Sequence, residues 1–150
     1  MERLHRLEHL STDNPVYFIT FCTSARKEIL ATPSNHTAFI AFCTEAMKRE
    51  IFVGRYILMP DHVHLFVKLP PPSENLSAWV KSLKNFLSKY LRQQQVTAPH
   101  WQKGFFDHVL RSDESYSAKW LYMVENSIRA GLVKSWTDWP YQGEIHALRF

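Results

Sequence analysis

Two histidines separated by one residue, His62 and His64, are the side chains whose types and spacing most directly suggest chemistry. They lie in the segment Met59-Pro60-Asp61-His62-Val63-His64, which continues into further apolar residues. On a β-strand, residues i and i+2 point to the same face, so the two imidazoles would lie side by side. Each could then give one nitrogen to a divalent metal ion. Two unrelated histidines on one sheet face would show the same spacing.

A metal site needs a third ligand, and a predicted helix near the C-terminus offers candidates. Tyr122, Glu125 and Asn126 occupy positions i, i+3 and i+4, which share one helix face. Such a helix, packed on the sheet, would bring a phenol and an oxygen ligand to the two histidines. A core tyrosine fits the same spacing, so spacing alone assigns Tyr122 no role.

The elements that must position these residues are predicted from local patterns. Runs of β-branched and aromatic residues predict strands at 16–23, 53–59, 62–69 and 105–110. Apolar residues at helical spacing predict helices at 36–50, from an N-cap at Ser73 to about Gln94, and at 114–130, the last with Ser112 or Asp113 as N-cap and Gly131 as C-cap.

The order of these elements, β-α-β-β-α-β-α, predicts the fold class. Its first six elements match an α+β, ferredoxin-like fold, in which an antiparallel sheet carries two helices on one face. The additional C-terminal helix would carry Tyr122. We expect one domain over residues 1–150, with a core at about 15–133 and an irregular strap at 134–150, because 150 residues suit a single core.

Composition excludes several classes of protein. The chain has four glycines and neither G-x-G-x-x-G nor G-x-x-x-x-G-K-[ST], which excludes Rossmann and P-loop nucleotide sites. Two cysteines are too few for a disulfide scaffold or a four-cysteine zinc site. No apolar run approaches the roughly 20 residues of a membrane helix, and the charged first residues lack a signal sequence. The expectation is a cytoplasmic protein with no membrane partner.

A modest excess of basic residues weakly favours nucleic acid as a ligand. The chain has 18 Lys and Arg against 14 Asp and Glu, and 14% of its residues are aromatic. The basic face of the helix ending near Gln94 is either a solvated face or a phosphate-facing stripe. Candidate DNA contacts are Lys81, Lys84, Lys89 and Arg92 on that face, Arg26, Lys27, Lys103 and Arg129 elsewhere, and Trp101 and Phe105 as stacking rings.

Four segments occur in an order that resembles a known family. They are Tyr17-Phe18-Ile19-Thr20-Phe21, Met59 to His64, Trp101-Gln102-Lys103-Gly104-Phe105-Phe106-Asp107-His108, and Tyr122 through Asn126 to Val133. Together they resemble the single-tyrosine HUH transposases of bacterial insertion sequences, and more closely the REP-associated tyrosine transposases. The ordered set, over residues 15 to 142, carries the resemblance.

The resemblance implies a role for each matching residue. His62 and His64 match the metal-binding pair, Tyr122 the nucleophile and Asn126 the residue that completes the metal site. Family members cut single-stranded DNA beside hairpins, forming a 5′-phosphotyrosine link and leaving a 3′-hydroxyl. The implied cofactor is Mg²⁺ or Mn²⁺. The implied partner is a REP-like or insertion-sequence hairpin in the bacterial nucleoid, bound by a monomer or a helix-swapped homodimer.

Several alternatives remain open at this level. Glu125 competes with Asn126 as ligand, and Tyr116, about 120° around the helix, competes less well as nucleophile. Family members often have proline where this chain has Ser127. Because serine does not interrupt a helix as proline does, Ser127 would extend this one. His108 is either a residue that supports a metal ligand from behind or a structural residue. Two other functions fit: a non-cleaving hairpin-binding module, and a ferredoxin-like protein that holds Zn²⁺.

Overall fold

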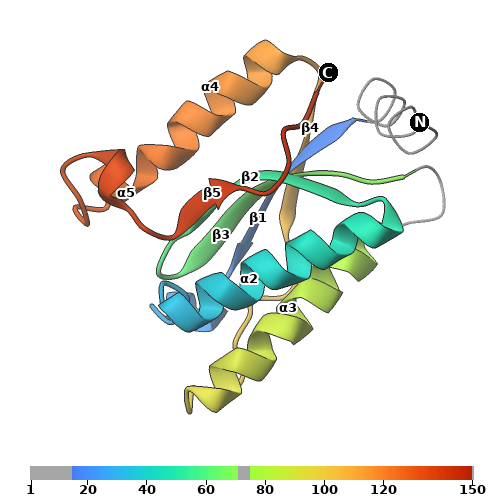
Figure 1. The fold of residues 1–150 in the computed structure, drawn as a ribbon. Coiled ribbons are helices and arrows are strands. Elements are labelled where there is room, and N and C mark those ends of the chain that lie inside the picture. The colour runs from blue at the N-terminus through green and yellow to red at the C-terminus, as the bar shows by residue number, and fades with distance from the viewer. Residues whose placement is uncertain (1–14, 71–74, 150) are drawn as a thin grey trace.

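A five-stranded antiparallel sheet, in the order β4-β1-β3-β2-β5, forms the centre of this computed structural model (Figure 1). The structure describes residues 15–70 and 75–149. Its strands are β1 (Val16–Cys22), β2 (Phe52–Leu58), β3 (His62–Lys68), β4 (Phe106–Leu110) and β5 (Gln142–Glu144). Its helices are α2 (Pro33–Ala46), α3 (Leu76–Gln93), α4 (Asp113–Val124) and α5 (Asn126–Arg129), with short 3₁₀ turns η1 (Ser24–Arg26), η2 (Met47–Arg49) and η3 (Trp136–Asp138).

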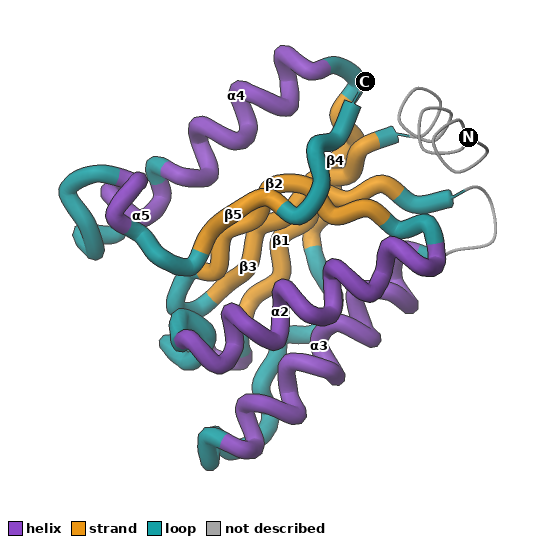
Figure 2. The backbone as a smooth tube through the Cα atoms, in the orientation of Figure 1, coloured by secondary structure: helices purple, strands orange, loops and turns teal. Residues whose placement is uncertain are grey.

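Helices cover the two faces of the sheet in separate groups. Helices α2 and α3 lie on one side, and α4 and α5 lie on the other (Figures 1 and 2). Alternate strand residues accordingly enter two clusters: Ile19 and Leu65 pack with α2 and α3, whereas Phe66 and Leu110 pack with Tyr116 of α4. His62 and His64 alternate in step with Phe66, so they belong to the α4 face.

The predicted fold class is confirmed. The first four strands have the order expected of a ferredoxin-like fold, and the predicted bounds agree with the observed ones to within a few residues. Strands β2 and β3 form a hairpin, closed where the Met59 N–H donates to the His62 carbonyl at 2.8 Å. β3 pairs with β1 on its other side, so both histidines stand on a strand that is fixed along both edges.

Three local predictions need correction. The helix expected over 114–130 divides at Glu125 into α4 and α5. It continues past Ser127 to Arg129, where Ala130 rather than the predicted Gly131 is the C-cap, and Gly131 follows with φ +72°. The α3 N-cap is Asn75, whose side chain accepts from the Ala78 N–H; Ser73 lies outside the described residues.

The strap expected to be irregular also contains a strand. Residues 142–144 form β5, which pairs with β2 and completes the sheet. Its Gln-Gly-Glu sequence has no apolar alternation, so its pairing depends on the free edge of β2 rather than on its own pattern. Trp139 anchors this segment: its ring is buried against the α4 face and its Nε1–H donates to the Leu58 carbonyl at 3.0 Å.

Trp139→Ala is expected to lower the free energy of unfolding by about 3 to 5 kcal/mol, because it removes a buried ring and leaves a cavity. Trp139→Phe keeps most of the packing and should cost less. Urea denaturation of the three proteins measures the difference. Equal stability of the alanine variant and the wild type would show that the strap does not support the fold.

Candidate active site

His62 and His64 lie side by side on β3, as the alternation predicts. Their ring centroids are 4.7 Å apart and the ring planes meet at 77°. Both side chains are buried beneath the end of the α4–α5 segment, and the Phe18 ring stacks on His64 at 5.3 Å. The two imidazoles are therefore largely shielded from solvent.

The Nδ1 atom of each histidine meets an oxygen. Asp61 Oδ1 lies 2.7 Å from His62 Nδ1, and Thr20 Oγ1 lies 2.7 Å from His64 Nδ1. Burial raises the pKa of Asp61, but hydrogen bonds from Arg26 and His62 outweigh it and the pKa is lowered. Asp61 is therefore an ionised acceptor, so His62 carries its proton on Nδ1.

The Nε2 atoms of both histidines converge on Asn126. Its Nδ2 lies 3.0 Å from His62 Nε2 and 3.3 Å from His64 Nε2. Because the His62 proton is on Nδ1, its Nε2 accepts from the amide, and the second amide proton faces His64. Glu125 points elsewhere: its carboxylate is 3.7 Å from Arg129 Nη1 and half exposed. The geometry thus places Asn126, not Glu125, against the histidine pair.

The two imidazoles are neutral at physiological pH. Burial lowers the pKa of His64 to about 3, with smaller contributions from His62, Arg129, Arg26 and Lys119. Burial also lowers the pKa of His62. Their Nε2 lone pairs are therefore available to a cation without loss of a proton.

The same burial makes the fold sensitive to acid. In the unfolded chain His64 titrates near pH 6.5, whereas in the fold its pKa is about 3. Between these values only the unfolded state binds the proton. The free energy of unfolding therefore decreases as the pH is lowered, by about 1.4 kcal/mol per pH unit for one histidine. Urea unfolding in metal-free buffer from pH 7 to about pH 4.5 should show a shallower slope for His64→Gln than for the wild type. Parallel slopes would contradict this.

Tyr122 is the exposed tyrosine of α4. Its side chain lies on the surface at 60% exposure, with the Arg129 guanidinium 4.5 Å from its ring centroid. Arg129 Nη2 also donates to the Tyr122 carbonyl at 2.8 Å, next to the break at Glu125. The guanidinium thus links α5 to the last turn of α4.

Tyr116 has a structural position instead. Its ring is buried on Phe66, its hydroxyl accepts from the Arg55 N–H at 3.1 Å, and burial raises its pKa to about 12. A buried phenol bonded to the backbone of β2 is poorly placed to attack a substrate. Of the two tyrosines considered, Tyr122 is the accessible one.

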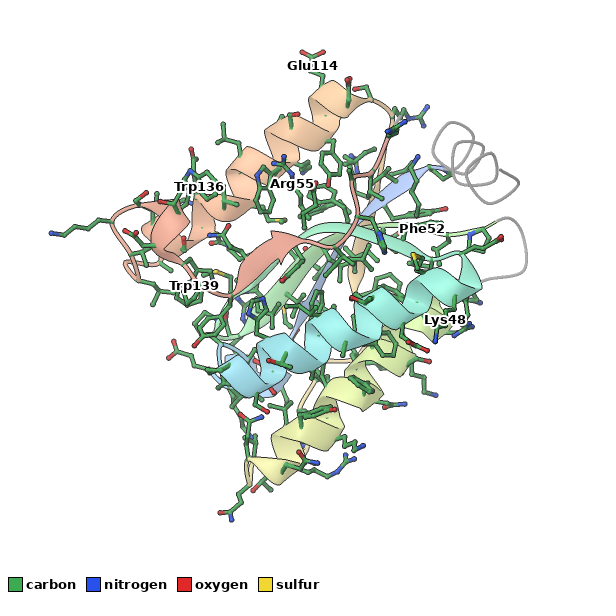
Figure 3. The ribbon with its side chains drawn as sticks, viewed as in Figure 1. Lys48, Phe52, Arg55, Glu114, Trp136 and Trp139 are labelled. Atoms are coloured by element: carbon green, nitrogen blue, oxygen red, sulfur yellow. The ribbon has the colours of Figure 1, made fainter. Side chains whose placement is uncertain are left out.

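A cluster of side chains holds α4 against the sheet of its own chain. Arg55, which is labelled in Figure 3, lies over the Trp120 ring at 4.9 Å and pairs with Glu144 of β5 at 3.3 Å. Trp120 in turn meets Trp136 edge to face. The helix that carries Tyr122 is therefore fixed to the same sheet that carries the histidines.

The predicted DNA contacts divide into four groups, the last of which is Lys84 and Trp101. Arg26 and Arg129 lie beside the histidine pair. Lys81, Lys89 and Arg92 belong to α3, which covers the opposite sheet face, while Lys27 and Lys103 are exposed in loops.

Lys84 and Trp101 have structural contacts. Lys84 Nζ donates to the Gly104 carbonyl at 2.6 Å, and burial lowers its pKa. Trp101 donates to Ser88 Oγ at 2.9 Å and packs edge-on against Phe21. The amphipathic pattern could not distinguish these inward contacts from a phosphate-facing surface.

Sequence reasoning missed two residues on the site's side of the sheet. Lys119 reaches over the Phe18 ring at 5.4 Å, one helical turn before Tyr122. Phe106 of β4 is 75% exposed, whereas Phe105 packs with the α2 and α3 core. Strand alternation could have found Phe106. His108 is exposed opposite Phe18 on β4, two strands from the histidine pair.

The donor set fits a divalent cation. Among the described residues, no group of three His, Cys, Asp or Glu side chains forms a metal cluster, so the third candidate ligand is an amide. Two convergent imidazole nitrogens with oxygen acceptors behind them match the usual arrangement of metal-binding histidines. All three groups are neutral, which leaves the charge of a cation free to attract a phosphate.

Comparisons with known proteins agree with this architecture. Residues 11–123 match the family described as transposase IS200 like. An Escherichia coli REP-associated tyrosine transposase is 22% identical over 125 residues, which are 83% of this chain and 73% of that protein. A Haemophilus influenzae protein provisionally given the same name is 29% identical over 94 residues, 56% of this chain; the match spans about half (53%) of its length.

A solved structure has the same fold. It is a REP-associated tyrosine transposase bound to a REP hairpin, with a TM-score of 0.67, 22% identity, and coverage of 85% of this chain and 75% of that one. No helix among the described residues is long and apolar enough to span a membrane. The family match covers most of the chain and includes both histidines and Tyr122. The chain belongs to the family of IS200-like transposases.

Proposed function

We propose that this protein is a metal-dependent strand transferase that cuts single-stranded DNA beside a hairpin through a covalent link to Tyr122. The observation that carries this proposal is the convergence of His62, His64 and Asn126, with an exposed Tyr122 one helical turn before Asn126. Two neighbouring elements, β3 and the α4–α5 segment, supply all four groups.

The residues near the pair have complementary roles. His62 and His64 would hold Mg²⁺ or Mn²⁺ through Nε2. Asn126 would bind through its amide oxygen once the amide turns over, because its Nδ2 faces the two Nε2 atoms in this structure. The imidazoles favour Mn²⁺. When bound, the ion polarises the scissile phosphate and offsets charge in the transition state. Asp61 and Thr20 fix the ring orientations from behind.

The reaction is a transfer in which one phosphoester replaces another. The Tyr122 oxygen attacks the scissile phosphorus, and the bond from phosphorus to the 3′-oxygen breaks. The phenol proton is lost to solvent, and the departing oxygen gains a proton to become a 3′-hydroxyl. The 5′ phosphate stays on Tyr122 until a 3′-hydroxyl attacks it in the reverse sense. No nucleotide hydrolysis is needed, because each step conserves one phosphoester bond.

The proposed partner is a REP-like or insertion-sequence hairpin with a single-stranded flank, in the bacterial nucleoid. The names of the relatives and the hairpin bound in the similar structure support this choice. Arg26, Lys119 and Arg129 supply positive charge around the histidines. The packing of α4 on the sheet of its own chain supports a site formed within one copy and cleavage by a monomer.

The test is a denaturing gel of the purified protein with a library of labelled single-stranded hairpins and Mn²⁺. A protein band that carries the label after denaturation supports the proposal. Binding in a native gel with no covalent band in Mn²⁺, Mg²⁺ or Zn²⁺ would replace it with the non-cleaving hairpin-binding module. Stoichiometric Zn²⁺ without any DNA binding would indicate a metal-binding protein of another kind.

A further inference from the structure

We propose that Phe106 is a base-stacking residue, and that the sheet face beside it, in the row from β4 to His64, receives an unpaired base next to the scissile phosphate. This inference rests on the proposed function and specifies a subsite for the same substrate.

Phe106 lies on the histidine face of the sheet. Along β4, Phe106, His108 and Leu110 point to one side and Asp107 and Val109 to the other. Leu110 packs in the cluster beneath α4, which identifies that side as the α4 face. Phe106 therefore shares a face with His62 and His64.

The strand register aligns Phe106 with the candidate site. Thr20 of β1 pairs with His64 on one side and with Phe106 on the other, so the three residues form one row across the sheet. Neighbouring strands are about 4.8 Å apart, which puts the backbone of Phe106 about 10 Å from that of His64. A nucleotide adjacent to a phosphate at the histidine pair can span this gap.

No packing among the described residues, 15–70 and 75–149, accounts for the position of the Phe106 ring. Its ring is 75% exposed, whereas its neighbour Phe105 packs against the core of the other face. Such a ring on an edge strand favours stacking with a partner outside the chain. A duplex hides its base faces, so the partner that fits is an unpaired base.

The surrounding charge favours a nucleotide over another aromatic ligand. Lys119 extends over Phe18, which pairs with His108 on β4, and Arg26 and Arg129 lie at the histidine end of the row. These cations can hold the phosphates while the ring of Phe106 takes the base. The row thus has positive charge at the histidine end and an aromatic ring at the Phe106 end. These two features match the phosphate and the base of a nucleotide.

The experiment uses a Tyr122→Phe background, so that DNA binds without being cut. Hairpin oligonucleotides carry 2-aminopurine at one single-stranded position at a time, and its fluorescence is quenched on stacking. We expect quenching at one position, lost in Phe106→Leu and retained in Phe106→Trp. Binding of the hairpin should weaken about 5- to 100-fold in Phe106→Leu.

Val109→Ala is the matched control, since Val109 is also exposed on β4 but on the opposite face. It should change neither quenching nor affinity, and all variants should unfold at the same temperature. Unchanged quenching and affinity in Phe106→Leu would overturn the inference. That outcome is separable from failure of the proposed function, which shows as a missing covalent band when Tyr122 and Phe106 are both intact.

Discussion

Tyr122→Phe is expected to abolish the covalent protein–DNA band, with a loss of at least about 10³-fold in the rate of cleavage, because the phenylalanine ring has no oxygen to attack phosphorus. The exposed position of Tyr122 predicts no loss of folding and no loss of hairpin binding. The rate is measured as the appearance of labelled protein on a denaturing gel, and mass spectrometry of the digested adduct identifies the modified residue.

Tyr116→Phe is the matched control on the same helix, and it should show the opposite pattern. The covalent band should persist, whereas the free energy of unfolding should fall by about 1 to 3 kcal/mol because the Arg55 N–H loses its acceptor. A band that survives Tyr122→Phe and disappears in a folded Tyr116→Phe would move the nucleophile to Tyr116.

The parts of this structure that follow local patterns could be predicted from the sequence. Alternation on β3 placed His62 and His64 on one face, and helical spacing brought Asn126 to them. The same spacing could not separate Asn126 from Glu125, because both positions, i+4 and i+3 from Tyr122, lie within about 60° of Tyr122 around the helix. The choice depends on tertiary contacts: the segment divides at Glu125, whose carboxylate faces Arg129.

Contacts between elements that are distant in the sequence could not be predicted from the local pattern of residues. Thr20 meets His64 only because β1 pairs with β3 in that register. Lys84 has the same spacing as the other basic residues of α3, but the loop before β4 passes close enough to accept from it. Strand β5 exists because β2 presents a free edge, and its own three residues carry no pattern. Each of these depends on the assembled sheet.

Asn126→Ala is expected to weaken Mn²⁺ binding by at least about 10-fold and to slow adduct formation by at least as much, because it removes a proposed ligand. Glu125→Gln is the matched control one residue away and should behave as the wild type. Electron paramagnetic resonance of free Mn²⁺ measures binding without any requirement for catalysis.

Asn126→Asp separates a ligand from a merely structural amide. A carboxylate is a hard, charged oxygen ligand, so the variant should keep Mn²⁺ and gain affinity for Mg²⁺ relative to the wild type. A structural amide that only donates to the two histidines would instead be disrupted, because an ionised aspartate has no proton to give. Loss of Mn²⁺ binding in Glu125→Gln, with Asn126→Ala unaffected, would assign the third ligand to Glu125 and would require the α4–α5 segment to rotate when the cation binds.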